Sequence, residues 1–258
     1  MRYVLRRGVI GPNVQVPIDA GAYERYKAAR RVLSAAFAIE EAYEILISNY
    51  HEFETTLLES AAFGMLRMHV GYSDHFDNRL VLNRRLINLF TTTRLYLDHL
   101  RQHIAASASD PIDALARIEA VTSEQYDSCR EYRFMDAFRN YVQHRGIPIH
   151  WISHGSSWTF DEDGEKELMR FFVEIVAEAS VLRKDSALKS KPLQELEERT
   201  DLTLYTRRYI ECLSTIQDAV RDITGEPIRE ARALMEEAHK RYLEAGAETV
   251  ISLSGCAM

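Results

Sequence analysis

The feature that most constrains this fold is residues 21–70, a long stretch without proline. Its apolar side chains recur at alternating spacings of three and four positions, in the series Ala36, Ile39, Tyr43, Leu46, Tyr50, Phe53 and Leu57. That spacing places them along one side of an α-helix. The stretch therefore predicts one long helix, or two helices nearly end to end, with a single face to bury.

A second long helix is predicted at about residues 79–106, after a loop at residues 71–78. Its buried face is formed by Leu82, Leu86, Leu89, Phe90, Thr93, Leu97, Leu100 and Ile104. Two long helices joined by a short loop pack antiparallel. We therefore expect a mainly all-α protein, built as a multi-helix bundle with long antiparallel helices.

Capping residues and helix breakers predict the remaining helices. Asp110 followed by Pro111 indicates the start of a short helix that ends near residue 120. Thr122 to Gln125 resembles a capping box, and it would open a helix over residues 122–145. Further helices are expected at about 165–188, 192–223 and 226–245, the last two divided near Pro227.

Short β-structure is expected at two places. Residues 1–20 hold β-like runs among glycines and prolines, which predicts an arm or a short strand ahead of the helical bundle at residues 21–245. Apolar residues alternate after Gly146, which predicts a small β-hairpin at about residues 147–160. Residues 246–258 form a short C-terminal tail.

Composition is typical of a globular protein. Hydrophobic residues make up 46% and charged residues 28%, and no apolar run approaches the roughly 18 residues that a membrane span needs. Charged residues interrupt the N-terminal segment, so no secretory signal peptide is predicted and the expected location is cytoplasmic. Cys129, Cys212 and Cys256 are scattered and odd in number, so we expect no disulfide framework, no metal site and no other cofactor.

The net charge of −7 argues against a protein that coats nucleic acid regardless of sequence, because such proteins carry a basic excess. Arginine pairs such as Arg30-Arg31 and Arg84-Arg85 are interpreted as solvated or salt-bridged positions on helix surfaces. The charge balance is still compatible with a small RNA-binding site.

Chemistry is indicated most specifically at residues 131–146, an amphipathic segment that ends at Gly146. On a helical wheel, Arg139, Asn140 and His144 occupy its polar side. Arginine can hold a phosphate and histidine can move a proton, as RNA cleavage without a metal requires. Arg139 and His144 lie about 140° apart around the helix axis. They can therefore converge only across a groove, for instance between two copies of the helix.

The order Arg139-Asn140-x-x-x-His144 resembles the signature of the HEPN superfamily. These are small α-helical domains, many of them dimeric, metal-independent endoribonucleases of toxin–antitoxin and antiviral systems. The resemblance implies a composite site from two protomers, in which His144 acts on the attacking 2′-hydroxyl or the leaving oxygen. Arg139 would neutralise the pentavalent phosphate, and Asn140 would position one or the other. Other arginine–histidine pairs share the spacing, but only Arg139 is followed by a polar residue of the expected type.

The wider segment from Glu131 to Pro148 also resembles a set of uncharacterised bacterial helical proteins. This similarity extends over most of the chain, but no activity is known for those proteins. The HEPN resemblance leads us to expect a homodimeric endoribonuclease with RNA as its substrate. The resemblance suggests a toxin or antiviral defence effector with an antitoxin or other protein as partner, and no membrane. The alternative is a non-catalytic helical module for dimerisation or protein binding, in which the polar residues of 131–146 form a solvent face.

Other histidines carry no recognised mechanism in the sequence. His144, His150 and His154 together with Cys129 fit no established zinc spacing. His150 and His154 are interpreted as satisfied surface or hairpin residues, with His154 in the predicted turn. His75 flanks the predicted loop, and its position indicates no function.

Overall fold

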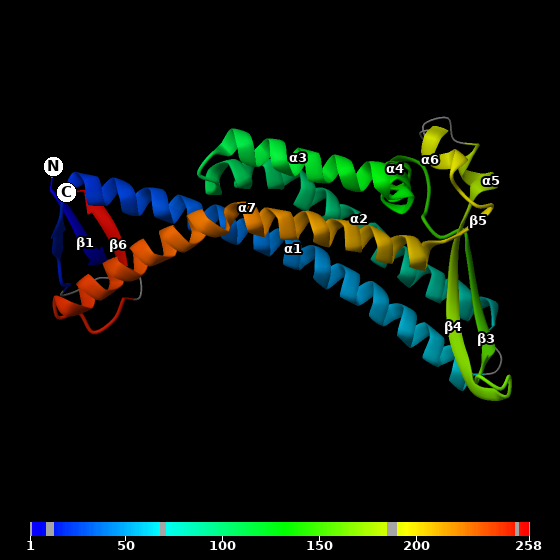
Figure 1. The fold of residues 1–258 in the computed structure, drawn as a ribbon. Coiled ribbons are helices and arrows are strands. Elements are labelled where there is room, and N and C mark those ends of the chain that lie inside the picture. The colour runs from blue at the N-terminus through cyan, green and yellow to red at the C-terminus, as the bar shows by residue number, and fades with distance from the viewer. Residues whose placement is uncertain (1, 9–12, 68–70, 185–189, 251–252, 258) are drawn as a thin grey trace. The chain divides into compact units, whose positions relative to one another are not determined.

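The computed structural model describes residues 2–8, 13–67, 71–184, 190–250 and 253–257, and the protein is mainly helical (Figure 1). Seven helices and six strands occur within these ranges. The chain divides into two compact units. The terminal unit consists of residues 1–41, 99–119 and 218–258, and the central unit consists of residues 42–98 and 120–217.

The first predicted helix is confirmed as α1 (Ala20–Leu66). It begins behind Asp19, whose carboxylate accepts a hydrogen bond of 2.6 Å from the backbone N–H of Ala22 and so caps the helix. The predicted seam is buried at Ile39, Leu46, Phe53 and Leu57. The last part of the prediction, residues 68–70, lies outside the described residues.

The second long helix, α2 (Tyr72–Ser107), begins earlier than the sequence predicts. The loop expected at residues 71–78 is wrong beyond Gly71. Asp74 explains the difference, because its carboxylate accepts a hydrogen bond of 2.9 Å from the backbone N–H of Gly71 and adds negative charge to the first turn. The predicted apolar face is buried at Leu82, Leu86, Leu89, Phe90, Thr93, Leu100 and Ile104.

The boundary between α3 (Pro111–Ser128) and α4 (Arg130–His144) lies at Cys129. The predicted helix start at Thr122 is wrong, because α3 continues through that residue. Cys129 has an extended backbone, and its sulfur accepts a hydrogen bond from the backbone N–H of Tyr132. A cysteine therefore occupies the N-cap position where serine, threonine or aspartate is the usual signal.

Arg133 stabilises this break between the helices. Its guanidinium donates to the backbone carbonyls of Tyr126 and Asp127, at 2.8 and 2.6 Å, and so satisfies the exposed end of α3. Glu195 accepts from the same guanidinium at 3.0 Å. Because Glu195 is distant in sequence, this cap could not be predicted from the local pattern.

The β-hairpin is longer than predicted, and its second strand replaces a predicted helix. β3 (Trp151–Phe160) pairs antiparallel with β4 (Lys166–Glu178). The helix expected at 165–188 is therefore wrong. The hairpin boundaries of 147–160 are wrong as well, because the predicted turn lies inside β3. Aromatic and β-branched residues are frequent in β4, and they favour a strand.

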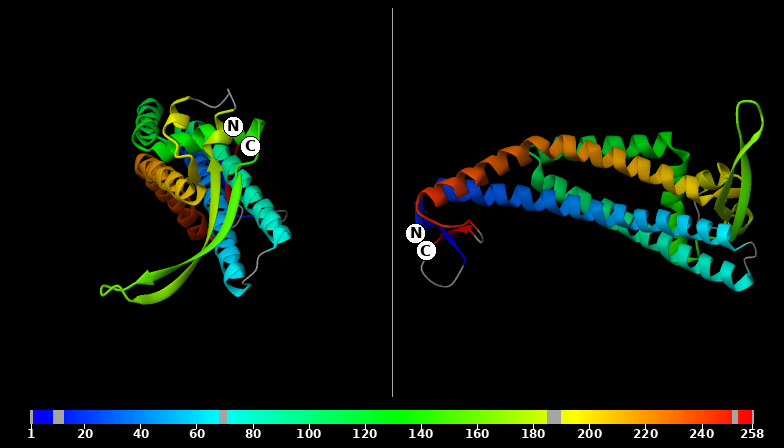
Figure 2. Two further views of the ribbon diagram at one scale, coloured as in Figure 1. Left: turned by 90° about the vertical axis from the view of Figure 1, so that its right-hand side faces the viewer. Right: turned by 90° about the horizontal axis from the view of Figure 1, so that it is seen from below.

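The turn and the base of the hairpin are both held by specific contacts. Asp161 accepts hydrogen bonds from the backbone N–H groups of Asp163 and Glu165, at 3.1 and 2.8 Å. At the base, β4 also pairs with β5 (Arg199–Asp201), which gives a three-stranded sheet. The distal part of the hairpin stands away from the helices of the central unit (Figure 2).

Three helices follow the hairpin: α5 (Ala179–Leu182), α6 (Ser190–Gln194) and α7 (Leu202–Glu244). The predicted division near Pro227 is wrong, because α7 continues through this proline. A proline inside a helix costs about 3 kcal/mol. Buried side chains on both sides of it, Val220, Thr224 and Ala231, stabilise the continuous helix.

The terminal unit contains a three-stranded sheet in the order β2 (Val16–Ile18), β1 (Tyr3–Arg7), β6 (Leu253–Ala257). The expected arm at residues 1–20 thus includes two short strands, and the C-terminal tail contributes the third. One buried cluster of this unit comprises Leu5, Val16, Ile18, Ala22, Ala238 and Tyr242.

The central unit is held by contacts between α1, α2 and α7. The rings of Tyr43 and Tyr96 lie 5.6 Å apart, and the hydroxyl of Tyr43 donates to Ser214 Oγ at 2.9 Å. Arg207 donates two hydrogen bonds to Glu54, at 2.8 and 2.7 Å. None of the helices over the described ranges combines the length and apolarity that a membrane span requires.

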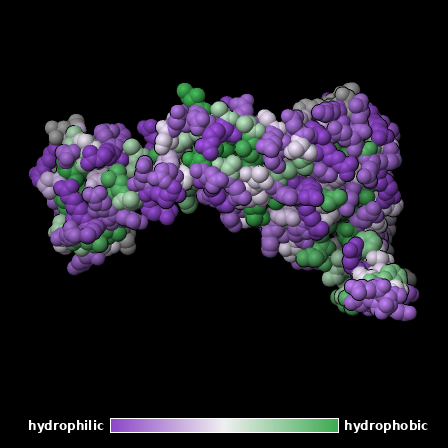
Figure 3. Space-filling model, viewed as in Figure 1, coloured by the Kyte–Doolittle hydropathy of each residue, from purple (hydrophilic) through white to green (hydrophobic). Residues whose placement is uncertain are grey.

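Hydrophobic side chains also remain on the surface of the central unit. Leu58, Met65 and Leu66 near the end of α1 are 70%, 48% and 78% exposed. Figure 3 shows hydrophobic surface over this end of α1 and on the neighbouring hairpin. The end of α1, the start of α2 and the hairpin therefore enclose an apolar part of the surface.

Candidate functional site

Of the three predicted site residues, α4 buries one and exposes two. Arg139 is only 4% exposed. Asn140 and His144 are exposed. The predicted apolar side of the helix is buried at Phe134, Met135, Ala137 and Phe138, so its direction is as the helical wheel predicts. Arg139 lies at the edge of the polar arc, and tertiary packing covers this edge.

The Arg139 guanidinium is engaged inside the central unit. Its Nη2 lies 3.3 Å from a carboxylate oxygen of Asp136 and 3.4 Å from Asn140 Oδ1. Nε and Nη1 are buried and have no hydrogen-bond partner in the described part of the chain. Burial raises the pKa of the neighbouring Tyr132 and Tyr209, and the positive charge of Arg139 opposes this rise. Arg139 is therefore an interior cation beside two tyrosines.

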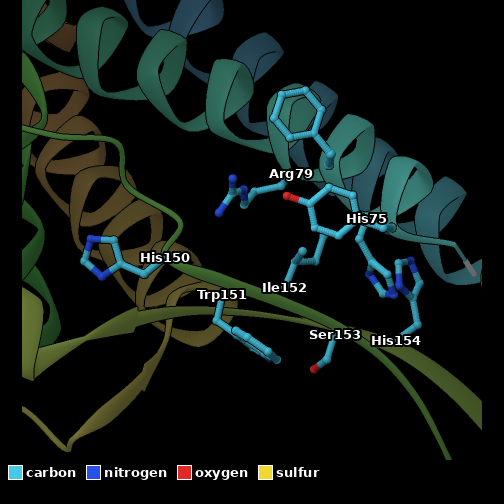
Figure 4. A pocket seen from close by; sticks show the side chains of 9 residues that line it. His75, Arg79, His150, Trp151, Ile152, Ser153 and His154 are labelled. Carbon is cyan, nitrogen blue, oxygen red and sulfur yellow. The ribbon is translucent and has the colours of Figure 1, made fainter.

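A second set of chemically active side chains lies where α2 faces β3. Tyr72, His75, Phe76 and Arg79 from α2 and residues 150–154 before and within β3 line a groove of about 410 Å³, which we call the histidine groove. Figure 4 shows His75 and His154 side by side at one end of the groove, and Arg79 extending from α2 across its middle.

The two elements place these side chains for simple geometric reasons. Residues three and four apart lie on one face of a helix, and this relation links Tyr72, His75, Phe76 and Arg79. Side chains two apart lie on one face of a strand, which links Ile152 and His154. Asn83 fixes the approach to β3, because its side-chain oxygen accepts the backbone N–H of Ile149 at 2.8 Å.

His75 and His154 form a close imidazole pair. Their ring centroids lie 5.1 Å apart with an interplanar angle of 56°. The Nδ1 atom of each ring is buried and has no hydrogen-bond partner among the described residues. The other nitrogen of His154, Nε2, lies 3.0 Å from Oγ of the buried Ser60 on α1. A Cβ atom on Gly64 would lie 3.0 Å from the His154 ring, so α1 approaches this closely because that residue is glycine.

His150 lies at the other end of the groove. Its Nδ1 accepts the backbone N–H of Glu178 at 2.9 Å, so the neutral ring carries its proton on Nε2. Nε2 is buried without a partner in the described ranges. Burial lowers the pKa of His150, and the charge of Arg79 lowers it further, while Glu178 opposes this shift. His150 and His154, predicted to be satisfied side chains, each have one nitrogen with a hydrogen-bond partner and one buried nitrogen without a partner in the described ranges.

The electrostatics of the groove favour neutral imidazoles at His150 and His154 and leave a cation available. Burial lowers the pKa of His154, and the neighbouring His75 lowers it further. No carboxylate lies within ion-pair distance of Arg79 in the part of the chain that the structure describes. A low-pKa imidazole suits a general base, and an unpaired guanidinium suits an anion.

Sequence reasoning missed this site because its parts are distant along the chain. His75 lies in the segment interpreted as a loop, and His154 lies in the segment interpreted as a turn. They meet only because α2 begins at Tyr72 and β3 continues to Phe160. Among the described residues, no group of three or more His, Cys, Asp or Glu side chains converges as metal ligands would.

Comparison with known proteins gives no further guidance on this site. No protein-family model, no curated protein and no solved structure matches the chain.

Proposed function

We propose that the protein is a metal-independent endoribonuclease, and that His75 and His154 in the histidine groove transfer protons during RNA cleavage. The observation that carries the proposal is the pair of buried Nδ1 atoms without partners. Buried polar atoms in a native structure nearly always have a partner, so this unpaired pair, buried at the end of the groove, favours a ligand that reaches the two nitrogens when the rings move apart. A bound phosphodiester would separate the rings and engage both nitrogens.

The contact with Ser60 is compatible with the tautomer of His154 that this scheme requires. If Nε2–H donates to Ser60 Oγ across the 3.0 Å contact, Nδ1 keeps its lone pair. Nδ1 then removes the proton from the ribose 2′-hydroxyl, and the 2′-oxygen attacks phosphorus. Ser60 is a positioning residue in this scheme, because it fixes the ring of the base.

A protonated His75 completes the reaction. It donates its proton to the leaving 5′-oxygen as the phosphorus–oxygen bond breaks, which yields a 2′,3′-cyclic phosphate and a 5′-hydroxyl. Arg79 extends across the groove and would stabilise the charge on the pentavalent phosphorus. Protein groups alone balance the protons in this scheme, as a metal-independent reaction requires.

The proposed scaffold is an antiparallel bundle. Two contacts pair α1 with α2: Tyr43 with Tyr96, and Glu52 with Arg85. Residue numbers rise along α1 as they fall along α2, which is the order that antiparallel helices give. Such a bundle would hold the first turn of α2 rigidly beside Ser60, and rigid support is what a catalytic pair needs.

The HEPN-type site on α4 is the competing proposal for the same activity. Asn140 and His144 are exposed and accessible to a second copy of the chain, and Arg139 keeps two buried N–H groups without partners in the described residues. In that proposal a homodimer, with RNA as substrate and an antitoxin or other protein as partner, forms the composite site. A non-catalytic helical module is the alternative to both nuclease sites.

Cleavage of a labelled single-stranded RNA in the presence of EDTA tests the proposal. We expect the wild-type protein to release fragments that end in a cyclic phosphate, and the His154→Gln variant to release almost none. His51→Gln is the matched control, because His51 is exposed on α1. Equal cleavage by wild type and His154→Gln would contradict the site, and no cleavage by wild type would contradict the activity.

A further inference from the structure

The histidine pair separates the groove from a second cavity. This cavity has a volume of about 670 Å³ and shares His75 and His154 with the histidine groove. Its remaining walls come from Met65 at the end of α1, from Arg67 just after this helix, and from Phe171 and Phe172 of the hairpin. The proposed reaction centre therefore lies between two hollows.

The two hollows have similar chemistry although they are built from different elements. Each contains aromatic rings: Tyr72 and Phe76 of α2 in the groove, and Phe171 and Phe172 in the second cavity. Each also contains one arginine, Arg79 or Arg67. The Arg67 guanidinium lies 4.7 Å from the ring of Phe63, and it has no carboxylate within ion-pair distance among the described residues.

Aromatic rings beside arginine are the usual binding elements for single-stranded nucleic acid. Bases stack on the rings regardless of sequence, and the guanidinium contacts phosphate. A base must leave its own stack to enter such a cavity, so a duplex is excluded. The net charge of −7 also fits a short binding site rather than a long phosphate track.

Glycine at position 155 leaves room for the Phe172 ring, which packs over the backbone of β3. A Cβ atom at Gly155 would lie 2.5 Å from the Phe172 ring. Any larger residue would displace this ring, which is part of the cavity wall.

We infer that the substrate is a single-stranded RNA segment that occupies both hollows, with one nucleotide on each side of the scissile phosphate. The base on one side stacks in the groove near Tyr72 and Phe76, and the base on the other side stacks near Phe171 and Phe172. Arg79 contacts the scissile phosphate, and Arg67 contacts the next phosphate on the side of the second cavity. The inference rests on the proposed function, because the scissile phosphate is placed at His75 and His154.

Binding without cleavage separates this inference from the proposed function. The probe is a fluorescent single-stranded oligonucleotide with 2′-fluoro riboses, which lacks the attacking hydroxyl, and its anisotropy is measured with wild-type protein in EDTA. We expect saturable binding, about tenfold weaker binding of the same sequence as a duplex, and little binding of a single nucleotide.

Arginine variants locate the strand. Arg67→Ala and Arg79→Ala should each weaken binding several-fold and reduce the slope of log affinity against log salt by about 0.7. Arg84→Ala is the control, because Arg84 is exposed on α2 outside both cavities. If only one of the two variants loses affinity, the strand does not occupy both cavities and the inference is overturned. Equal affinity for the duplex would overturn it as well.

The two hypotheses fail in different ways. Binding that depends on both arginines, without cleavage of ordinary RNA, supports the strand site and contradicts the nuclease. If His154→Gln abolishes cleavage but Arg67→Ala leaves the affinity unchanged, the nuclease is supported and binding of the strand in the second cavity is contradicted. Absence of saturable binding contradicts the inference directly, whatever the cleavage result.

Discussion

The α4 motif and the histidine groove contain similar residue types, but the burial and the pairing of these residues differ between the two sites. On α4 the arginine is buried and paired with Asp136, and His144 is exposed to solvent. In the groove Arg79 is half buried without a carboxylate partner in the described chain, and His154 is partly buried against Ser60. A residue order that matches a known motif indicates which residue types are present. The packing of neighbouring elements decides whether those residues can reach a ligand.

The largest expected effect separates the two sites by activity. His75→Ala and His154→Gln should each lower the rate of RNA cleavage by about 10²- to 10⁴-fold, since each removes a proton-transfer group. Asn140→Ala and His144→Gln, both at exposed positions, should leave the rate within about twofold of wild type if the α4 residues have no catalytic role. Rates under EDTA in single-turnover conditions are the measurement. Loss of activity in the α4 variants, with near wild-type rates in the groove variants, would show that the catalytic site is on α4.

The next effect concerns the buried cation of α4. Asp136→Ala removes the carboxylate beside Arg139, and we expect a loss of about 2 kcal/mol in the free energy of unfolding. The loss is smaller than for a fully buried pair, because the Asp136 side chain is 26% exposed. Urea denaturation measures it. In the double variant with Arg139→Met, most of the loss should be recovered, and a larger combined loss would show that Arg139 has other stabilising partners.

A comparable effect is expected at the base of the groove. Asn83→Ala leaves the buried backbone N–H of Ile149 without its acceptor, which should cost about 1–3 kcal/mol in the free energy of unfolding. Because Asn83 joins α2 to the chain before β3, cleavage should also fall at temperatures well below unfolding. Asn88→Ala, at an exposed position on the same helix, is the control. Unchanged stability would show that water or another group replaces the amide.

The pH dependence follows from two lowered pKa values. Burial lowers the pKa of His150 and of His154 below the ordinary 6.5, so the folded protein binds these protons less readily than the unfolded chain. Their contribution to stability is therefore complete above about pH 6.5 and is lost as pH falls through the folded-state pKa values. Protonated His150 can no longer accept the N–H of Glu178. His150→Gln should flatten the acid limb of a thermal-unfolding profile, and an unchanged limb would contradict this account.

The smallest effects are expected for a substitution at Gly64, which should raise stability and lower activity. Gly64→Ala should stabilise α1 by up to about 1 kcal/mol through helix propensity. Its Cβ would lie 3.0 Å from the His154 ring, so it should displace the base and lower the cleavage rate several-fold. A gain in stability with full activity would show that the ring position is not critical.

Local patterns predicted the parts of the fold that depend on one helix face. The seam of α1 and the apolar face of α2 are buried as expected, because a helix must cover such a stripe whatever its neighbours are. The error at β4 has the same origin. Leu168, Phe171, Phe172 and Ile175 have helical spacing, but the segment pairs with β3, and strand pairing is not encoded in local periodicity.

Other errors reflect contacts between distant residues. The break at Cys129 depends on Arg133 and Glu195, and the continuity of α7 through Pro227 depends on tertiary packing. The histidine groove could not be predicted for the same reason, because Ser60, His75 and His154 belong to three elements that are far apart along the chain. The residue types at the predicted α4 site were identifiable from sequence, and the burial of Arg139 was not.

The most direct test of the central claim is NMR of the histidine side chains during titration with the non-cleavable single-stranded oligonucleotide. The imidazole nitrogen signals of His75 and His154, assigned with single-histidine variants, should shift and saturate together, while the signal of the exposed His144 stays in place. Shifts of His144 with unchanged signals from His75 and His154 would contradict the claim that the histidine groove binds the phosphodiester.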